Sequence, residues 1–302
     1  MRSRLVGTVV AALVAAAALT ASSPAATGGV PKSTWYWTMA VAPASPSVLV
    51  LGTSGGLYRS ADGGRSWRAV GPRGFNATSV VDSGTTMLAA GSARPAASEA
   101  VLNEQGRFAV APGKRLFLAS SDAGRTWREL RPAGLPAAAV QALAVDPASA
   151  GSLIAVARGG ALFRSTDGGR TFRPFSPKVG GTGWALAVTE DGQLVSGDMT
   201  TGSYVSADGK RWQRTGFRDS RGSRMAMEFA VQPGDSSHVL MSAYGVESSS
   251  DGGKTWHPVL RSKVMFGPTA WAPSDASRAY AVGFDRSLWT SDDGGTTWKK
   301  VS

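Results

Sequence analysis

The chain of 302 residues carries a formal net charge of +11 and contains no cysteine. The missing cysteines exclude disulfides, thiolate ligands for a metal and a lipid anchor attached through sulfur. The two histidines, His238 and His257, do not form a ligand-spaced pair, and the sequence has no phosphate-binding glycine loop or dinucleotide fingerprint, so it predicts neither a metal nor a cofactor.

The first 26 residues have the composition of a secretory signal. Arg2 and Arg4 precede an apolar run over residues 5–21, and small residues fill positions 22–26. This order of charged, apolar and small-residue regions is typical of a signal peptide that is removed after export. A retained transmembrane anchor is the alternative, but the run is short and rich in alanine for a span. We therefore predict a signal peptide over residues 1–26, no transmembrane anchor after cleavage, and a secreted or extracytoplasmic protein.

One motif recurs six times in the rest of the chain. Its consensus is S-x-D-x-G-x-T-W, and we call each copy a box; the fourth copy is one residue shorter than the others. The aspartates of the six boxes are Asp62, Asp122, Asp167, Asp208, Asp251 and Asp293. They are separated by 60, 45, 41, 43 and 42 residues, the period at which a repeat forms one four-stranded blade of a β-propeller.

Each box has the composition of a tight hairpin turn. Glycine supplies the positive φ angles of such a turn, and the short Ser and Asp side chains accept hydrogen bonds from its backbone N–H groups. The aromatic residue that ends the box begins the next strand, where its ring packs against the hairpin and the neighbouring blade. A catalytic or metal-binding role for the aspartates is the alternative. Because turn chemistry recurs wherever the turn recurs, we interpret the six aspartates as structural.

Short apolar segments around the boxes complete the repeats. An innermost strand ending in A-V-x-P stands upstream of several boxes, at residues 39–43, 143–147 and 229–233. A second and a third apolar segment lead into each box, and a fourth begins at its aromatic residue. The sequence therefore predicts an all-β fold, a six-bladed β-propeller of four-stranded antiparallel blades over residues 27–302. The long first interval predicts an insertion of about 17 residues, which we place in blade two at about residues 92–115.

The boxes resemble the Asp-box, or BNR repeat, of the sialidase-like propellers, and the resemblance covers nearly the whole chain after residue 26. It implies that the boxes occupy one face and that a functional site lies on the opposite face, around the central channel. That site would be built from the starts of innermost strands and from the loops between second and third strands. On this mapping the ligand-binding candidates are Trp35, Tyr36, Trp37, Trp184, Arg224 and Arg286, joined by Arg158 and by Glu99, Glu104 and Arg107 of the insertion.

The same mapping gives four catalytic candidates, Glu228, Tyr244, Asp198 and Asp285. The sialidase mechanism uses three arginines on the substrate carboxylate, a tyrosine nucleophile beside a glutamate, and an aspartate as acid and base; Tyr244 and Glu228 are the pair that one sector of the channel would hold. A glycosidase with two carboxylates would use Asp198, Glu228 or Asp285. The family's Phe/Tyr-Arg-Ile-Pro motif is absent before the first box, and three channel arginines cannot be assigned. The alternative is that these are ordinary strand-end and rim residues.

Basic residues gather in the boxes and in the strands that follow them. The net charge falls from +11 to +9 when Arg2 and Arg4 leave with the signal. Because the boxes share one edge of the ring, the remaining charge gives that edge a positive field that attracts polyanions. A glycan or a cell-envelope polyanion is then a candidate partner, and a solvated basic surface without a specific partner is the alternative. Nucleic acid is not expected, because the chain has no nucleic-acid-binding module and is predicted to be exported.

Two functions remain open at this point. The first is an exported binding or scaffold propeller for a glycan, a peptide or a cell-surface partner, similar to noncatalytic Asp-box proteins such as sortilin-type receptors and photosystem-assembly propellers. The second is an exported glycoside hydrolase of the sialidase-like superfamily. The aromatic start of blade one favours a sugar-facing surface, whereas the missing sialidase motifs favour binding. Because fold alone does not decide function, we rest the choice on those motifs and expect a binding protein rather than an enzyme.

Overall fold

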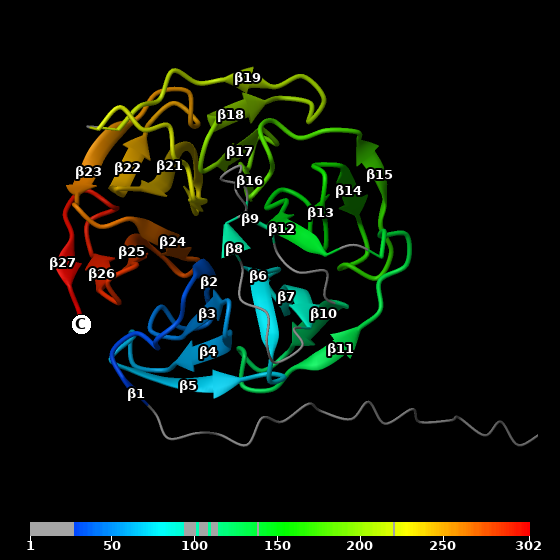
Figure 1. Cartoon of the computed structure of the whole chain (residues 1–302), viewed down its shortest axis with the longest axis horizontal. Coiled ribbons are helices and arrows are strands. Elements are labelled where there is room, and N and C mark those ends of the chain that lie inside the picture. The colour runs from blue at the N-terminus through cyan, green and yellow to red at the C-terminus, as the bar shows by residue number, and fades with distance from the viewer. Residues whose placement is uncertain (1–26, 94–100, 103–107, 110–113, 138, 220) are drawn as a thin grey trace, which may run out of the picture.

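The computed structural model describes residues 27–302 apart from 94–100, 103–107, 110–113, 138 and 220 (Figure 1). The predicted signal peptide, together with Glu99, Glu104 and Arg107, lies outside the described residues. The described part of the chain is entirely β, with 27 strands. It holds no helix with the length and hydrophobicity needed to cross a bilayer.

Six antiparallel blades surround a central channel, as predicted from the spacing of the boxes (Figure 1). Blade one contains β2 (Tyr36–Val41), β3 (Leu49–Thr53), β4 (Gly56–Ser60) and β5 (Ser66–Val70), and blade two contains β6 (Phe75–Asp82), β7 (Met87–Ala93), β10 (Arg115–Ser120) and β11 (Arg128–Leu130). Blade three contains β12 (Val140–Val145), β13 (Leu153–Ala157), β14 (Leu162–Ser165) and β15 (Arg173–Ser176), and blade four contains β16 (Ala185–Val188), β17 (Leu194–Asp198), β18 (Gly202–Ser206) and β19 (Gln213–Arg214). Blade five contains β20 (Glu228–Gln232), β21 (Asp235–Ala243), β22 (Gly245–Ser249) and β23 (His257–Arg261), and blade six contains β24 (Phe266–Ala272), β25 (Asp275–Gly283), β26 (Leu288–Ser291) and β27 (Lys299–Lys300).

The strands of each blade run in chain order from the channel outwards. Every box therefore occupies the hairpin between the third and fourth strands, on the same face as the loop between the first and second strands. Backbone hydrogen bonds join the two turns within a blade, as from the N–H of Gly168 to the carbonyl oxygen of Gly151 at 2.9 Å and from Gly252 to Ser237 at 2.9 Å. We call this face the box face and the other one the opposite face.

The third box shows how the motif closes its turn. The Ser165 hydroxyl donates to Asp167 Oδ1 at 2.8 Å and accepts from the N–H of Gly169 at 3.0 Å. Asp167 Oδ1 also accepts from the N–H groups of Arg170 and Thr171, and the Thr171 hydroxyl donates to Oδ2 at 2.5 Å. These bonds, that of the Thr171 hydroxyl first, hold the pKa of Asp167 well below its ordinary value. The serine and the aspartate together thus accept hydrogen bonds from the donors of the turn.

The fourth box closes with one residue fewer. The N–H of Gly209 reaches the Ser206 hydroxyl at 2.9 Å over three residues rather than four. Asp208 Oδ1 accepts from the N–H groups of Lys210 and Arg211, and the Arg211 side chain donates to Oδ2 at 3.1 Å in place of the threonine hydroxyl. The same carboxylate therefore serves a shorter turn.

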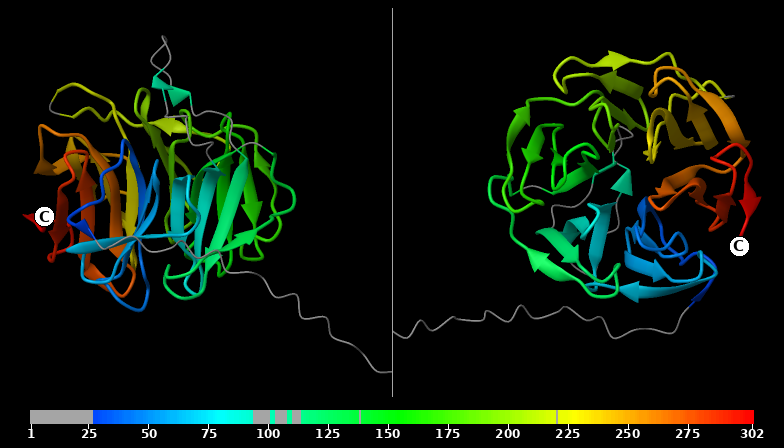
Figure 2. Two further views of the ribbon diagram at one scale, coloured as in Figure 1. Left: turned by 60° about the horizontal axis from the view of Figure 1, so that its bottom comes forward. Right: turned by 180° about the vertical axis from the view of Figure 1, so that it is seen from behind.

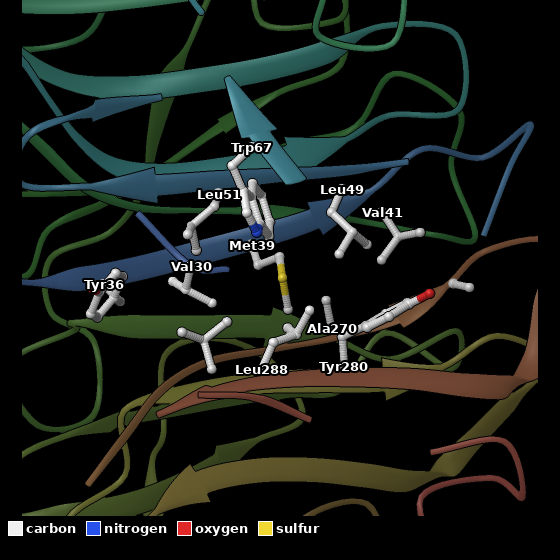
Figure 3. Packing of buried hydrophobic residues seen from close by; sticks show 12 residues of the cluster. Val30, Tyr36, Met39, Val41, Leu49, Leu51, Trp67, Ala270, Tyr280 and Leu288 are labelled. Atoms are coloured by element: carbon white, nitrogen blue, oxygen red, sulfur yellow. The ribbon is translucent and has the colours of Figure 1, made fainter. Parts of the chain in front are cut away.

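Apolar side chains fill the space between neighbouring blades. The ring of Trp67, at the end of the first box, is 1% exposed, and its Nε1 donates to the carbonyl oxygen of Gly64 at 3.0 Å. Figure 3 shows Trp67 and Met39 of blade one packed against Leu288 and Ala270 of blade six. The box aromatic therefore joins its own turn to the interface between two blades.

A short segment ahead of blade one closes the ring. Strand β1 (Thr27–Gly28) pairs with the outer strand β5 and gives blade one a fifth strand. Val30 lies in the core between blades one and six, and its carbonyl oxygen accepts from Arg286 Nε of blade six at 3.0 Å. The first and last blades are thus joined by side-chain packing and hydrogen bonds rather than by a shared four-stranded sheet.

The connection between β7 and β10 is long, and it carries the strands β8 (Val101–Leu102) and β9 (Phe108–Ala109). As a loop between second and third strands it belongs to the opposite face. Figure 1 shows β8 and β9 near the centre of the ring, and Figure 2 shows them standing beyond one face. The two short strands described within the segment that we predicted as an insertion therefore lie over the axis of the propeller.

Candidate functional site

The central channel holds a cavity of about 320 Å³. Its walls are the innermost strands of all six blades, and most lining residues are Ala, Val, Leu or other apolar types. The lining extends from Glu228 and Thr269 at the inner end to Pro147, Pro233 and Pro273 at the box face. Pro147 and Pro273 are exposed, which shows that the cavity opens on the box face.

Stacked tryptophans stand at the other end of the channel. The ring of Trp35 stacks on Trp37, with centroids 5.3 Å apart, and Trp37 stacks on Trp184 of blade four at 5.5 Å. Trp37 Nε1 donates to Asn76 Oδ1 at 2.9 Å, which fixes the middle ring. A small cavity of about 10 Å³ lies beside Trp37 and Trp184, and the stacked rings span the channel at the end toward the opposite face.

The predicted aromatic residues of blade one therefore differ in what they present. Trp35 is partly exposed on the opposite face, where the sequence placed a ligand surface. Tyr36 corrects that expectation, because its side chain is 0% exposed and its hydroxyl donates to the carbonyl oxygen of Pro31 at 2.7 Å. Its ring packs edge-on against Phe284 between blades one and six, so it offers no surface to a ligand.

Glu228 lies at the inner end of the cavity, where β20 begins. Burial among apolar neighbours raises the pKa of its carboxyl group well above the ordinary value. Within the described residues the carboxylate has no hydrogen bond and no ion pair. Tyr244, its predicted partner, lies in the loop after β21, and its ring is covered by the Arg221 guanidinium at 4.1 Å. No described hydrogen bond joins Tyr244 to Glu228.

Asp198 has a role within its own loop. The side chain is 1% exposed, and its oxygens accept from the N–H groups of Thr182, Thr200 and Thr201 at 2.9, 2.7 and 2.6 Å. Burial raises the pKa of this carboxyl, but the bonds from Thr201, Thr200 and Thr182 outweigh it, and the net pKa lies below the ordinary value. Asp198 does not line the cavity that holds Glu228.

Asp285 and Arg286 are both exposed in the loop between β25 and β26. Asp285 accepts from the N–H of Ser287 at 3.1 Å and from its hydroxyl at 2.6 Å, and it does not line the cavity. Arg286 donates to the carbonyl oxygen of Val30, as described above. The four catalytic candidates therefore do not converge on one site among the described residues.

Four arginines crowd the opposite face between blades four and five. They are Arg214, Arg218, Arg221 and Arg224, and we call residues 214–224 the arginine loop. The positive charges of Arg214 and Arg218 lower the pKa of Arg224, which shows that the guanidinium groups lie close together. None of the four forms an ion pair with a described residue. The sequence analysis singled out Arg224 alone, although four arginines within eleven residues were visible.

Two acidic residues at the mouth of the channel were also missed. Asp82 and Glu190 line the cavity where β6 and β16 end. Burial raises the pKa of Asp82 to about 6 despite a hydrogen bond from the N–H of Gly84. Glu190 Oε1 accepts from the N–H of Gly234 at 2.8 Å. Blades two and four lack the proline that ends the other innermost strands, and this departure from the repeat was the available clue.

The basic residues of the boxes and outer strands are exposed. They include Arg65, Arg68, Arg125, Arg128, Arg170, Arg173, Lys210, Arg211, Lys254, Lys299 and Lys300. A few are in surface ion pairs, such as Lys299 with Asp292 and Arg211 with Asp208. Exposed pairs of this kind contribute little to stability. The positive field of this edge therefore affects the solubility of the protein and its rate of encounter with anionic partners.

The repeat, the closed ring and the turn chemistry define a BNR-type β-propeller. The sequence model of one family, the photosystem II assembly factor YCF48, matches residues 98–302. The match covers more than half of the chain, and the chain belongs to this family. Among proteins with curated descriptions, none matches the sequence.

Solved structures show the same architecture at low sequence identity. YCF48 bound to D1 peptide has a TM-score of 0.53 and 17% identity, over 91% of this chain and 83% of that one. YCF48 from Cyanidioschyzon merolae has a TM-score of 0.51 and 15% identity, over 92% and 88%. The GH74 xyloglucanase from Xanthomonas campestris has a TM-score of 0.56 and 18% identity, over 92% of this chain but 47% of that enzyme. At such identities the likeness concerns the fold, and it supports a BNR-type propeller without singling out the sialidase branch.

Proposed function

We propose that the protein is an exported binding or scaffold propeller that holds a peptide segment of a partner protein on the face opposite the boxes. The arginine loop carries this proposal. The charges of Arg214 and Arg218 act on Arg224, and none of these three arginines forms an ion pair with a described residue. The planar guanidinium fork matches a carboxylate in two hydrogen bonds, so the loop suits the acidic side chains or the terminal carboxylate of a peptide.

Tyr244 adds an apolar element beside these charges. Its ring lies under the Arg221 guanidinium at 4.1 Å, and it belongs to the loop between β21 and β22 on the same face. Arginine and tyrosine together are enriched at the residues that dominate the energy of protein interfaces. A solved member of the same family is bound to a peptide, YCF48 bound to D1 peptide, and this relative supports a peptide rather than a glycan as the partner.

The glycoside hydrolase alternative has less support. Glycosidase chemistry needs two carboxyl groups about 5–10 Å apart on either side of a sugar-sized cleft, or a tyrosine nucleophile with its glutamate. Glu228 lies inside the channel behind the tryptophan stack, and neither Asp198 nor Asp285 lines that cavity. Tyr244 engages Arg221 instead of Glu228. The hydrolase function therefore has no assembled site in the described structure.

Peptide binding can be tested with matched charge variants. We expect an acidic peptide with a free C-terminus to bind the purified protein. The variant Arg218→Gln/Arg224→Gln should bind it at least about a hundredfold more weakly, because hydrogen bonds to charged groups contribute about 1.5–3 kcal/mol each. The control Arg128→Gln/Arg173→Gln removes the same charge from exposed positions on outer strands. An equal loss of peptide affinity in both variants would indicate nonspecific electrostatic attraction. Tighter binding of a sulfated glycan than of the peptide would show that the partner is a glycan.

Export is a separate part of the proposal and rests on residues 1–26. We expect the full chain, expressed in a bacterial host, to be recovered outside the cytoplasm with its N-terminus near residue 27. Replacing two leucines of the apolar run, Leu5→Arg and Leu13→Arg, interrupts the apolar region that export requires. Recovery of unprocessed protein from the cytoplasm in both cases would reject export without bearing on peptide binding.

A further inference from the structure

The channel is a second candidate site, independent of the arginine loop and of peptide binding. From Glu228 to Pro233 the chain advances about 16 Å at about 3.3 Å per residue. The cavity therefore extends about 16 Å from the box face to its inner end, a depth that an extended aliphatic chain can span.

The polarity of the channel wall changes along its length. Its middle is apolar, with Ala40, Ala144, Ala187, Ala230 and Ala270 from five blades among the lining residues. Acidic side chains stand at its two ends, Asp82 and Glu190 near the mouth and Glu228 at the inner end. None of the described residues that line the cavity is Lys, Arg or His, although the chain carries a net charge of +11. The channel is thus an acidic and apolar site within a basic protein.

Glu228 is the residue that this arrangement leaves unexplained. Glu228 is partly exposed to the channel, and its carboxylate has no hydrogen bond or ion pair to a described residue, so it is available to a ligand in the cavity. An ammonium group at the inner end would form a charge-assisted hydrogen bond with this carboxylate and offset its lost hydration. Burial holds the pKa of the carboxyl high in the empty channel, and a bound cation would lower it again.

We propose that the channel binds a linear aliphatic amine, which enters from the box face and places its ammonium group at Glu228. The methylene chain then lies along Ala230 and Val231 of β20 and the equivalent small residues of the other blades. The stack of Trp37 on Trp184 closes the inner end and stops the chain beside Glu228. A second amine at the far end of the chain reaches Asp82 and Glu190 at the mouth.

The test compares ligands of equal length and different charge. Isothermal titration calorimetry with the purified protein should show octylamine binding at least tenfold more tightly than octanol or octanoate. Affinity should rise about fourfold for each methylene added between butylamine and octylamine, because one buried methylene contributes about 0.8 kcal/mol. Octylamine that does not bind, or octanoate that binds as tightly, would overturn the proposal.

Three variants assign the effect to the channel. Glu228→Gln should bring octylamine to the affinity of octanol, whereas Glu129→Gln on the outer strand β11 should leave the tenfold preference in place. Ala230→Leu, which narrows the channel, should weaken all three ligands, and far-UV circular dichroism checks that each variant is folded. A preference for octylamine that persists in folded Glu228→Gln, or octylamine binding that is unchanged in folded Ala230→Leu, would reject the site.

Discussion

Trp37 of blade one stacks on Trp184 of blade four across the axis of the propeller, with ring centroids 5.5 Å apart and an angle of 26° between the ring planes. Blades one and four face each other in a ring of six, so the pair joins opposite sides of the molecule (Figure 1). The contact also separates the two candidate sites. The arginine loop lies on one side of the stack, on the opposite face, and the cavity that holds Glu228 lies on the other side.

Removing one ring of this stack should destabilise the fold measurably. We expect Trp184→Ala to lower the free energy of unfolding by about 2 kcal/mol, because the stacked pair contributes about 0.5–1.5 kcal/mol beyond its buried area and the truncated side chain is only partly buried. Trp184→Phe keeps an aromatic ring and should recover at least half of the loss. Urea denaturation measures both values, and equal losses in the two variants would show that the stacking itself contributes nothing.

The boxes give a second stability prediction. Asp167→Ala removes the acceptor of the exposed N–H groups of Arg170 and Thr171, which water can replace in part, and should cost about 1 kcal/mol. Thr166→Ala changes an exposed residue of the same turn and should stay within about 0.5 kcal/mol of the parent. Peptide binding per folded molecule should not change in either variant. Selective loss of binding in folded Asp167→Ala would show that the box has a functional role.

The second box contains a residue under backbone strain. Ala123 has a φ angle of 55°, where the other boxes with a residue at this position place glycine, such as Gly63 at 68°. A non-glycine residue in the left-handed region costs about 1–2 kcal/mol. Glycine avoids this strain, but it loses more backbone entropy on folding. Ala123→Gly should therefore stabilise the protein by about 0.5–1 kcal/mol. Thermal unfolding followed by circular dichroism gives the sign, and a lower midpoint would contradict it.

The ring of blades was predictable because its determinants are local. Each box contains its own donors and acceptors, as the bonds among Ser165, Asp167 and Thr171 show, and the spacing of the boxes counts the blades. The contact between Trp37 and Trp184 depends on two segments 147 residues apart whose side chains reach across the axis. No local pattern carries that information, so the closure of the channel was not predicted.

The candidate site was predicted less well for a related reason. The positions of Glu228, Asp198 and Asp285 near strand ends followed from their places in the repeat. Their roles depend on the side chains and backbone groups around them. Asp198 accepts hydrogen bonds from Thr200 and Thr201, which lie two and three residues further along the chain, so its role in a turn could be predicted from the sequence. The apolar surroundings of Glu228 come from other blades, so they could not be predicted from the local sequence.

The raised pKa of Glu228 predicts how stability varies with pH. The pKa of an unfolded glutamate is about 4.3, and that of the folded residue is higher, so the folded state holds the proton more tightly. The contribution of Glu228 is fully present below about pH 4 and is lost as the pH rises through the folded-state pKa. Glu228→Gln should therefore gain stability over the parent as the pH is raised from 4 to 8, as measured by urea denaturation.

A box aspartate provides a control of opposite sign. Hydrogen bonds from Thr297, its hydroxyl first, lower the pKa of Asp293 to about 2. Its contribution is present above the unfolded value of about 3.9 and is lost as the pH falls toward 2. Asp293→Asn should therefore cost most near neutral pH and least in acid. A difference between Glu228→Gln and the parent that stays constant from pH 4 to 8 would mean that Glu228 is not desolvated in the folded protein.

The last prediction separates the binding protein from the hydrolase. A panel of aryl glycosides that includes sialosides should show no turnover by the purified protein, because Glu228 has no second carboxylate beside it and no contact with Tyr244 among the described residues. Glu228→Gln and Tyr244→Phe serve as the paired variants. Turnover that is present in the parent and disappears in both folded variants would establish Tyr244 and Glu228 as a catalytic pair. Turnover that disappears only in Glu228→Gln would point to a two-carboxylate mechanism, and either result would replace the binding function proposed for this propeller.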